Sequence, residues 1–159
     1  MLLTSAVLCA APKAEELLSY PLLQAEDNQT YLSKTWHGIN NSVGSIYLEC
    51  KNEPDFSDFN TLIYGHRMKN GSMFAALGNY KDKEFWSENS LILLDTLTQR
   101  NTYEIFAVFT TSASAEKGFR YHTFIQADSR QAYEDFIAQC KTLSLYDTGI
   151  TPVYGDKLI

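Results

Sequence analysis

Basic residues are scarce in this 159-residue chain, and none of them form a run. Lysine and arginine total 13 against 19 aspartate and glutamate residues, which gives a formal charge of −6 at pH 7. Binding to nucleic acid depends on clustered lysine and arginine side chains that neutralise phosphates. The chain has little to offer a phosphate backbone, so we expect no nucleic-acid partner.

Cysteine is also rare, and its spacing excludes two common uses. Cys9, Cys50 and Cys140 are far apart in the chain, so there is no Cys-x-x-Cys pair for metal or redox chemistry. An odd number of thiols also argues against a disulfide framework. Cys50 ends a predicted strand and Cys140 falls on the apolar face of a predicted helix, where a thiol behaves as a small hydrophobic group. We expect both to be core residues; the alternative for each is a nucleophile.

Long hydrophobic stretches are missing. The apolar segment Leu2–Ala11 has about half of the roughly 20 residues that span a bilayer, so it cannot be a complete membrane anchor. It resembles the apolar core of a signal peptide but lacks the positively charged leader. Two interpretations stay open for residues 1–19: a remnant signal or anchor, or an N-terminus that is apolar by chance.

Extended segments dominate the middle of the chain. They are rich in β-branched and aromatic residues, are separated by turn signals such as Asn70-Gly71, and predict strands. The predicted strands are Ser45–Cys50, Asn60–His66, Leu91–Asp95, Thr102–Thr110 and Tyr121–Gln126.

Helical patterns are fewer. Residues 72–77 and 81–86 predict one or two short helical turns. Residues 129–143 predict one long amphipathic helix, because apolar residues recur there at helical spacing. Asp128, with Gln131 three residues later, predicts the N-terminal cap of that helix. The order of elements is not a regular βαβ alternation and favours a small barrel or a strongly curved sheet in one domain.

His66 is the main candidate for chemistry. It ends the apolar run Thr61-Leu-Ile-Tyr-Gly-His66, which places its imidazole at the rim of a sheet, and Gly65 leaves backbone room for a ligand. Histidine titrates near neutral pH and suits acid/base catalysis. The alternative is a loop histidine bonded to a carbonyl oxygen.

Two other polar groupings are weaker candidates. Glu53, Asp55 and Asp58 crowd a turn beside Pro54, where a solvated turn is the default. The histidines at positions 37, 66 and 122 lack the i, i+4 spacing of a helical zinc motif, so a metal hydrolase built on them would have to assemble in space. We expect no metal and no cofactor.

A set of segments that starts at Tyr20 carries a specific resemblance. They are Tyr20-Pro-Leu-Leu-Gln24, Asp27-Asn28, Tyr31-Leu32, Gly44-Ser-Ile-Tyr-Leu48, Asp55-Phe-Ser-Asp58, Asn60-Thr-Leu-Ile-Tyr-Gly-His66, Met68 and Asn70-Gly-Ser-Met-Phe74. Together they resemble the class B sortases, cysteine transpeptidases that attach surface proteins to Gram-positive cell walls. The helix over 129–143 is similar to the long helix between the sixth and seventh strands of that family. The resemblance covers residues 20–159.

The resemblance implies a fold and a reaction. The fold is mainly β (α+β), a sortase-like β-barrel with inserted short helices and one long helix. A cysteine thiolate attacks a threonine carbonyl in a C-terminal sorting signal, and the acyl group then passes to an amine of the peptidoglycan precursor. The protein would act at the extracellular face of the plasma membrane, where an anchor that is not complete in this chain would be its only link to the membrane.

The resemblance also assigns roles to individual residues. It makes His66 the acid/base residue of the reaction. Asn28, Leu32, Tyr64 and Tyr121 would bind the sorting-signal peptide, although plain core packing is the alternative for Leu32 and Tyr64.

The chain departs from the family pattern at both ends. The family cysteine lies in a Thr-Leu-x-Thr-Cys strand that follows a segment like Asp156-Lys-Leu-Ile159, and the family arginine lies on the next strand; neither is among these 159 residues. We therefore expect a sortase-like domain over 20–159 without its last two strands and inactive as given, preceded by an unaligned segment over 1–19. The alternative is a non-catalytic protein that binds peptide or cell wall, or a gene remnant.

Overall fold

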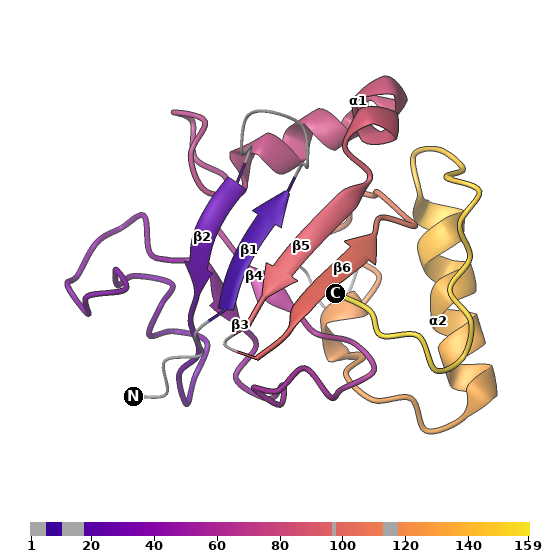
Figure 1. The fold of residues 1–159 in the computed structure, drawn as a ribbon, viewed down its shortest axis with the longest axis horizontal. Coiled ribbons are helices and arrows are strands. Elements are labelled where there is room, and N and C mark those ends of the chain that lie inside the picture. Colours follow the sequence, from indigo (N-terminus) through magenta and orange to yellow (C-terminus); the bar gives the residue numbers. More distant parts are fainter. Residues whose placement is uncertain (1–5, 11–17, 97, 113–117) are drawn as a thin grey trace.

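A four-stranded antiparallel sheet forms the centre of the molecule. The computed structural model describes residues 6–10, 18–96, 98–112 and 118–159. The strands are β1 (Ala6–Ala10), β2 (Leu18–Leu22), β5 (Leu91–Asp95) and β6 (Arg100–Glu104), in the order β2-β1-β5-β6. They lie side by side in Figure 1. The register pairs Leu8 with both Tyr20 and Leu94.

A second, two-stranded sheet continues from β2. It consists of β3 (Tyr47–Leu48) and β4 (Ile63–Tyr64), which pair antiparallel. Leu23, directly after β2, bridges to Tyr47, with hydrogen bonds from Leu23 N to Ile46 O and from Leu48 N to Leu23 O. The described strands thus follow one curved path from β4 to β6, and that path does not close between these two strands.

The main hydrophobic core lies between the two sheets. It is built from apolar side chains of β2, β3, β5 and the connecting segments, namely Leu22, Ile46, Leu48, Phe56, Met73 and Leu94. Leu94 is the fully buried residue of β5, because its side chain lies in this core, while the other residues of the strand are half-buried. In β6, exposed and half-buried residues alternate, as expected for an edge strand with one face in water.

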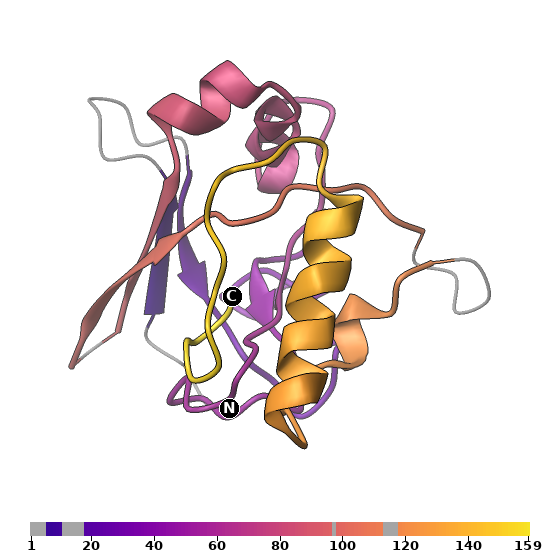
Figure 2. The same ribbon diagram turned by 90° about the vertical axis from the view of Figure 1, so that its right-hand side faces the viewer.

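The helices sit at the margins of the sheet. The 3₁₀ helix η1 (Phe74–Lys81) and helix α1 (Lys83–Glu88) follow one another, which confirms the short helical turns predicted there. Figure 2 shows the sheet and helix α2 (Arg130–Leu143) as separate layers with the C-terminal segment between them. Among the described helices, none combines the length and the apolar composition that crossing a membrane would need.

Helix α2 confirms the predicted long helix, and its apolar stripe packs on loops instead of on the sheet. Tyr133, Ile137 and Cys140 are its buried residues. Tyr133 and Ile137 form a cluster with Leu158, and the partly buried members of that cluster are Phe59, Phe106, Phe124, Ala127, Phe136 and Tyr154. The helix therefore holds the 59–60, 124–127 and 154–158 segments together.

Two predictions around α2 are wrong. Residues 121–126 form no strand; Tyr121–Thr123 is a 3₁₀ helix, η2, closed by the hydrogen bond from Phe124 N to Tyr121 O. The aromatic content that suggested a strand serves another purpose, because the Phe124 ring stacks on Phe136 of α2 with 4.0 Å between centroids. The cap of α2 is Ser129, whose side chain accepts from Ala132 N, and not Asp128.

Three predicted strands are shorter than expected. The segments 45–50 and 60–66 contain strands of only two residues each, and in the second segment Asn60 adds an isolated bridge to Leu158. The segment 102–110 leaves the sheet after Glu104, and its backbone bonds to the region after α2, as in the hydrogen bond from Leu145 N to Val108 O. Hydrophobic content predicted these segments as strands. Their length as strands is limited by the neighbouring backbone with which they can form hydrogen bonds.

The cap of α2 gives a direct test. Ser129→Ala should lower the free energy of unfolding by about 1 kcal/mol, because the N–H of Ala132 loses its acceptor. Asp128→Ala should change it by less than about 0.5 kcal/mol, as for an ordinary exposed position. Urea unfolding followed by circular dichroism measures both. A larger loss for Asp128→Ala would contradict this cap.

Candidate active site

His66 lies just beyond β4 and is held at two points. Its Nε2 is 3.1 Å from Leu32 O, and its backbone oxygen accepts from Phe74 N at 2.9 Å. A carbonyl oxygen can only accept, so Nε2 carries the proton of this bond. Nδ1 is then the ring atom left to take up or release a proton. The hydrogen bond to a carbonyl oxygen is the one that the alternative interpretation of His66 predicts, and the acid/base role stays a prediction.

The chain direction after β4 puts Tyr64 and His66 on one face and Gly65 on the other. A Cβ on Gly65 would lie 2.7 Å from Phe74 Cδ2 and would also meet Ile46. Glycine is needed at position 65 because the side chains of Ile46 and Phe74 occupy the place of a Cβ, and the backbone of Gly65 lines the cleft described below. Because side chains alternate along an extended chain, Tyr64 and His66 point away from that core.

A buried carboxylate, Glu49, organises the surroundings of Tyr64. Glu49 is 5% exposed and follows β3. Asn28 Nδ2 lies 2.9 and 2.8 Å from its two oxygens, and Tyr64 OH donates to Oε2 at 2.8 Å. Cys50 Sγ donates to Oε1 at 3.3 Å, and Cys50 N donates to Asn28 Oδ1 at 2.9 Å. Sequence reasoning did not single out Glu49, whose only signal is a charge at the end of an apolar strand.

The hydrogen bonds keep Glu49 ionised. Burial opposes its charge, but the donors Asn28, Tyr64 and Cys50 outweigh that effect and lower the pKa of Glu49 below 4.5. Burial raises the pKa of Tyr64, and the bond to Glu49 and its charge raise it further. Tyr64 therefore keeps its proton and donates it to Glu49.

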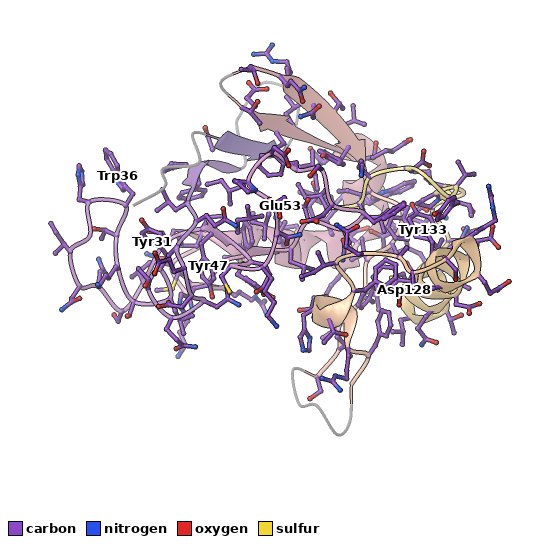
Figure 3. All side chains as sticks on the ribbon, turned by 90° about the horizontal axis from the view of Figure 1, so that it is seen from below. Tyr31, Trp36, Tyr47, Glu53, Asp128 and Tyr133 are labelled. Carbon is purple, nitrogen blue, oxygen red and sulfur yellow. The ribbon has the colours of Figure 1, made fainter. Side chains whose placement is uncertain are left out.

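Leu32 stands at the start of an exposed loop. Its side chain is 38% exposed, and its carbonyl is the partner of His66. In Figure 3 Trp36 projects from this loop, well away from Tyr31 and Tyr47 at its base. Tyr31 and Tyr47 are buried in one cluster with Leu23, against which Tyr64 packs. The loop is thus anchored beside β4 at the residue that orients His66.

Tyr121 belongs to the segment between β6 and α2. It begins η2, makes ring contacts with Phe109 and His122, and contributes electrostatically to the raised pKa of Tyr64. The segment that follows it is tied to the turn before β4, because Asn60 Nδ2 donates to Phe124 O at 2.7 Å. The segment that contains Tyr121 is thereby tied to the turn before β4.

The prediction of a solvated acidic turn beside Pro54 is wrong for one of its carboxylates. Asp55 is exposed, but Asp58 is only 2% exposed. Asp58 accepts from Asn52 Nδ2 at 2.6 Å, from Glu53 N at 2.7 Å and from Gln126 Nε2. Asp58 therefore links the β3–β4 connection to the segment that leads into α2.

A cleft of about 1210 Å³ lies between β6 and the segment that follows β4, where the curved path of strands does not close. Backbone and side chains of residues 100–111 form one wall, and Gly65, Arg67 and Phe74 form part of another. Of the five predicted site residues, Tyr121 is the one that lines it. Arg67, which directly follows His66, was not singled out from the sequence. The cleft thus runs past the histidine without including it.

The two described thiols are poor nucleophiles. Burial raises the pKa of Cys140 to about 12, and this residue is 3% exposed. Burial, the hydrogen bond to Glu49 and the charge of Glu49 raise the pKa of Cys50 above 9.0. The expectation that Cys140 is a core residue is confirmed. Cys50 is half-exposed and bonds to Glu49, so its assignment to the core is wrong.

The three histidines have separate partners. His66 bonds to Leu32 O. The His37 ring packs on Trp36 with 3.6 Å between ring centroids, and the His122 ring contacts Tyr121. Across the ranges that the structure describes, no three His, Cys, Asp or Glu side chains come together as metal ligands do. Nothing among those residues favours the metal-hydrolase interpretation.

Known proteins resemble this chain in sequence and in fold. A family model described as the sortase domain matches residues 11–138, which is most of the chain. The chain belongs to the sortase family. It is 32% identical to sortase B of Listeria monocytogenes over 142 residues, covering 89% of this chain and 56% of that protein. Sortase B of Staphylococcus aureus is 24% identical over 144 residues, with the same coverage.

Solved sortase B structures agree with the sequence matches. Sortase B from L. monocytogenes has a TM-score of 0.84 at 30% identity, covering 98% of this chain and 85% of that one. The S. aureus sortase B–substrate complex has a TM-score of 0.85 at 22% identity, covering 98% and 68%. The resemblance to class B sortases and the mainly β fold with a few helices are both confirmed. The sortase chain described here spans 56% of the length of its curated relatives, and the boundary at residue 19 stays a prediction.

The charge of Glu49 predicts an acid-dependent loss of stability. Glu49→Gln should lower the free energy of unfolding at neutral pH by about 1–3 kcal/mol, because an amide group then faces the donors Asn28 and Tyr64. A carboxyl whose folded-state pKa is depressed stabilises above its unfolded value and loses that contribution as pH falls through the folded value. The wild-type advantage should therefore be constant above pH 4.5 and shrink below it.

Urea unfolding of both proteins from neutral to acid pH measures this difference. Asp27 and Asp55, whose pKa values are also lowered by local hydrogen bonds, titrate in both proteins and cancel. A difference that stays constant through the acid range would contradict an ionised Glu49.

The thiols give a further test. Cys50 should react slowly with iodoacetamide at neutral pH and faster as pH rises past 9.0, because the thiolate is the reacting form. Cys140 should stay unmodified until the protein unfolds. Peptide mass mapping resolves the two sites, with a short unfolded cysteine peptide as the control. Rapid alkylation of Cys50 at neutral pH would contradict this geometry.

Proposed function

We propose that this chain is part of a class B cysteine transpeptidase that attaches surface proteins to peptidoglycan, and that His66 is its acid/base residue. The observation that carries the proposal is the orientation of His66. Leu32 O holds Nε2, and Nδ1 is left for proton transfer on the face that it shares with Tyr64. Membership of the sortase family supports the reaction class.

The proposed reaction needs one proton carrier in two steps. A cysteine thiolate attacks a peptide carbonyl to form a thioester, and the departing amine takes a proton from the His66 imidazolium. An incoming amine then attacks the thioester, gives a proton to the His66 imidazole and releases the thiolate. The raised pKa values of Cys50 and Cys140 argue that neither is the nucleophile.

The proposed partners follow from the family. One solved structure is S. aureus sortase B in complex with substrate, and another is sortase B in complex with triglycine. For this protein we propose a sorting-signal peptide as acyl donor and an amine of the peptidoglycan precursor as acceptor. Asn28, Leu32, Tyr64 and Tyr121 are the proposed peptide contacts. These partners lie outside the plasma membrane, so we propose the extracellular face as the place of action.

The test uses the intact protein that carries these 159 residues. A sorting peptide with a fluorophore and a quencher at its two ends, plus triglycine as acceptor, reports cleavage and transfer. His66→Ala should lower kcat/KM by about 10²–10⁴-fold, which is the usual contribution of an acid/base group. His37→Ala, an exposed histidine that rests on Trp36, should leave kcat/KM unchanged.

Two outcomes would contradict the proposal. Equal activity of His66→Ala and wild type would remove His66 from the mechanism. Peptide binding without turnover by the intact wild-type protein would favour a non-catalytic peptide-binding protein instead. Thermal unfolding of each variant shows whether a loss of activity reflects loss of the fold.

A further inference from the structure

Glu49 is a buried charge that the proposed reaction does not use. Among the described residues, no lysine, arginine or histidine lies within ion-pair distance of its carboxylate. Neutral donors from three parts of the chain stabilise it instead: Asn28 from the segment after β2, Tyr64 from β4, and the adjacent Cys50. A buried carboxylate is costly unless it is well bonded, so its presence between two proposed peptide contacts requires an explanation.

The Glu49 carboxylate determines which hydrogen bond Tyr64 can form with a ligand. A phenol has one proton, and Tyr64 gives it to Glu49 Oε2 at 2.8 Å. The Tyr64 oxygen can then only accept. A ligand that reaches it must therefore donate a hydrogen bond, through a peptide N–H or an amine.

The carboxylate also settles the orientation of Asn28. Its amide nitrogen faces both oxygens of Glu49, and its amide oxygen accepts from Cys50 N. The reverse orientation would place an amide oxygen against a carboxylate and leave the N–H of Cys50 without this acceptor. Asn28 and Tyr64 are thus held by one group, and Tyr64 lies on the same side of the chain as His66.

We propose that Glu49 is a positioning residue that makes the Tyr64 hydroxyl an obligate hydrogen-bond acceptor beside His66, so that the site selects a ligand that donates a hydrogen bond there. The inference rests on the proposed function and deepens it. Two ligands carry the required group: the N–H groups of the sorting peptide and the amino group of the acceptor.

The experiment compares ligands that differ by one donor. One arm uses the peptide bound in the S. aureus sortase B–substrate complex, with each backbone N–H replaced in turn by N-methyl. The other arm uses triglycine and N-acetyl-triglycine. Dissociation constants are measured by calorimetry on the intact wild-type protein and on the variants Tyr64→Phe, Glu49→Gln and Glu26→Gln.

If the ligand donates to Tyr64, one of these changes, a single N-methyl replacement or the N-acetylation of triglycine, removes the donor. That change should weaken binding to the wild type by about tenfold, the usual effect of losing a buried hydrogen bond. The same change should cost less than about threefold in Tyr64→Phe, because the acceptor is gone. It should also cost less than about threefold in Glu49→Gln, where an amide N–H is available to bond to the tyrosine oxygen. Glu26→Gln removes an exposed charge nearby and should behave as wild type.

Kinetics separate positioning from a merely structural role. Glu49→Gln should raise KM for the ligand identified in the binding arms and leave kcat within about threefold, because His66 keeps its bond to Leu32 O. If Glu49→Gln fails to fold, the ligand pair measured on wild type and Tyr64→Phe still tests whether the ligand donates to Tyr64, and an equal penalty in both proteins would overturn the proposal.

The outcomes are distinguishable. Turnover by wild type, together with the same penalty for each ligand change in wild type and Tyr64→Phe, would overturn the role of Glu49 and leave the proposed function intact. An absence of binding and turnover in wild type would overturn both. A penalty confined to the N-methyl peptides assigns the donor to the sorting peptide, and one confined to N-acetyl-triglycine assigns it to the acceptor.

Discussion

Two buried carboxylates, Glu49 and Asp58, hold the connection between β3 and β4, and the rest of the site depends on them. Gln24 Nε2 donates to Glu49 O and Asn52 O, which ties this connection to the segment after β2. Asn52 also receives a hydrogen bond from Leu62 N. Buried polar groups of this kind are costly unless each has a partner, so the network admits one arrangement of the backbone before β4.

That arrangement determines where His66 stands. β4 has only two paired residues, too few to position a side chain by themselves. The core side chains Ile46 and Phe74 fill the place where a Cβ of Gly65 would lie, so residue 65 must face inward. The neighbours Tyr64 and His66 then face outward, where Glu49 and Leu32 O orient them. The chemistry of the site thus depends on packing on one face of the strand and on hydrogen bonds on the other.

Local patterns predicted the elements whose hydrogen bonds are local or whose burial is uniform. The helical period predicted α2 because its bonds close within four residues, and the apolar run predicted β5 because that strand lies between two others. The same reasoning failed at residues 121–126, where aromatic side chains pack on α2 instead of joining a ladder. It also failed at Asp58, whose neighbours in the sequence suggested a solvated turn.

The sequence alone determined the family, the mainly β class, the long helix, and His66, Asn28 and Tyr64 as residues to examine. Only the tertiary structure decided what these residues do to one another. Tyr64 reaches Glu49 across 15 positions, Asn28 reaches it across 21, and His66 reaches Leu32 across 34. Contacts of that range leave no periodic signal, because they depend on how the curved sheet brings distant segments together. The hydrogen bonds of Glu49 to Asn28 and Tyr64 therefore could not be predicted from the sequence.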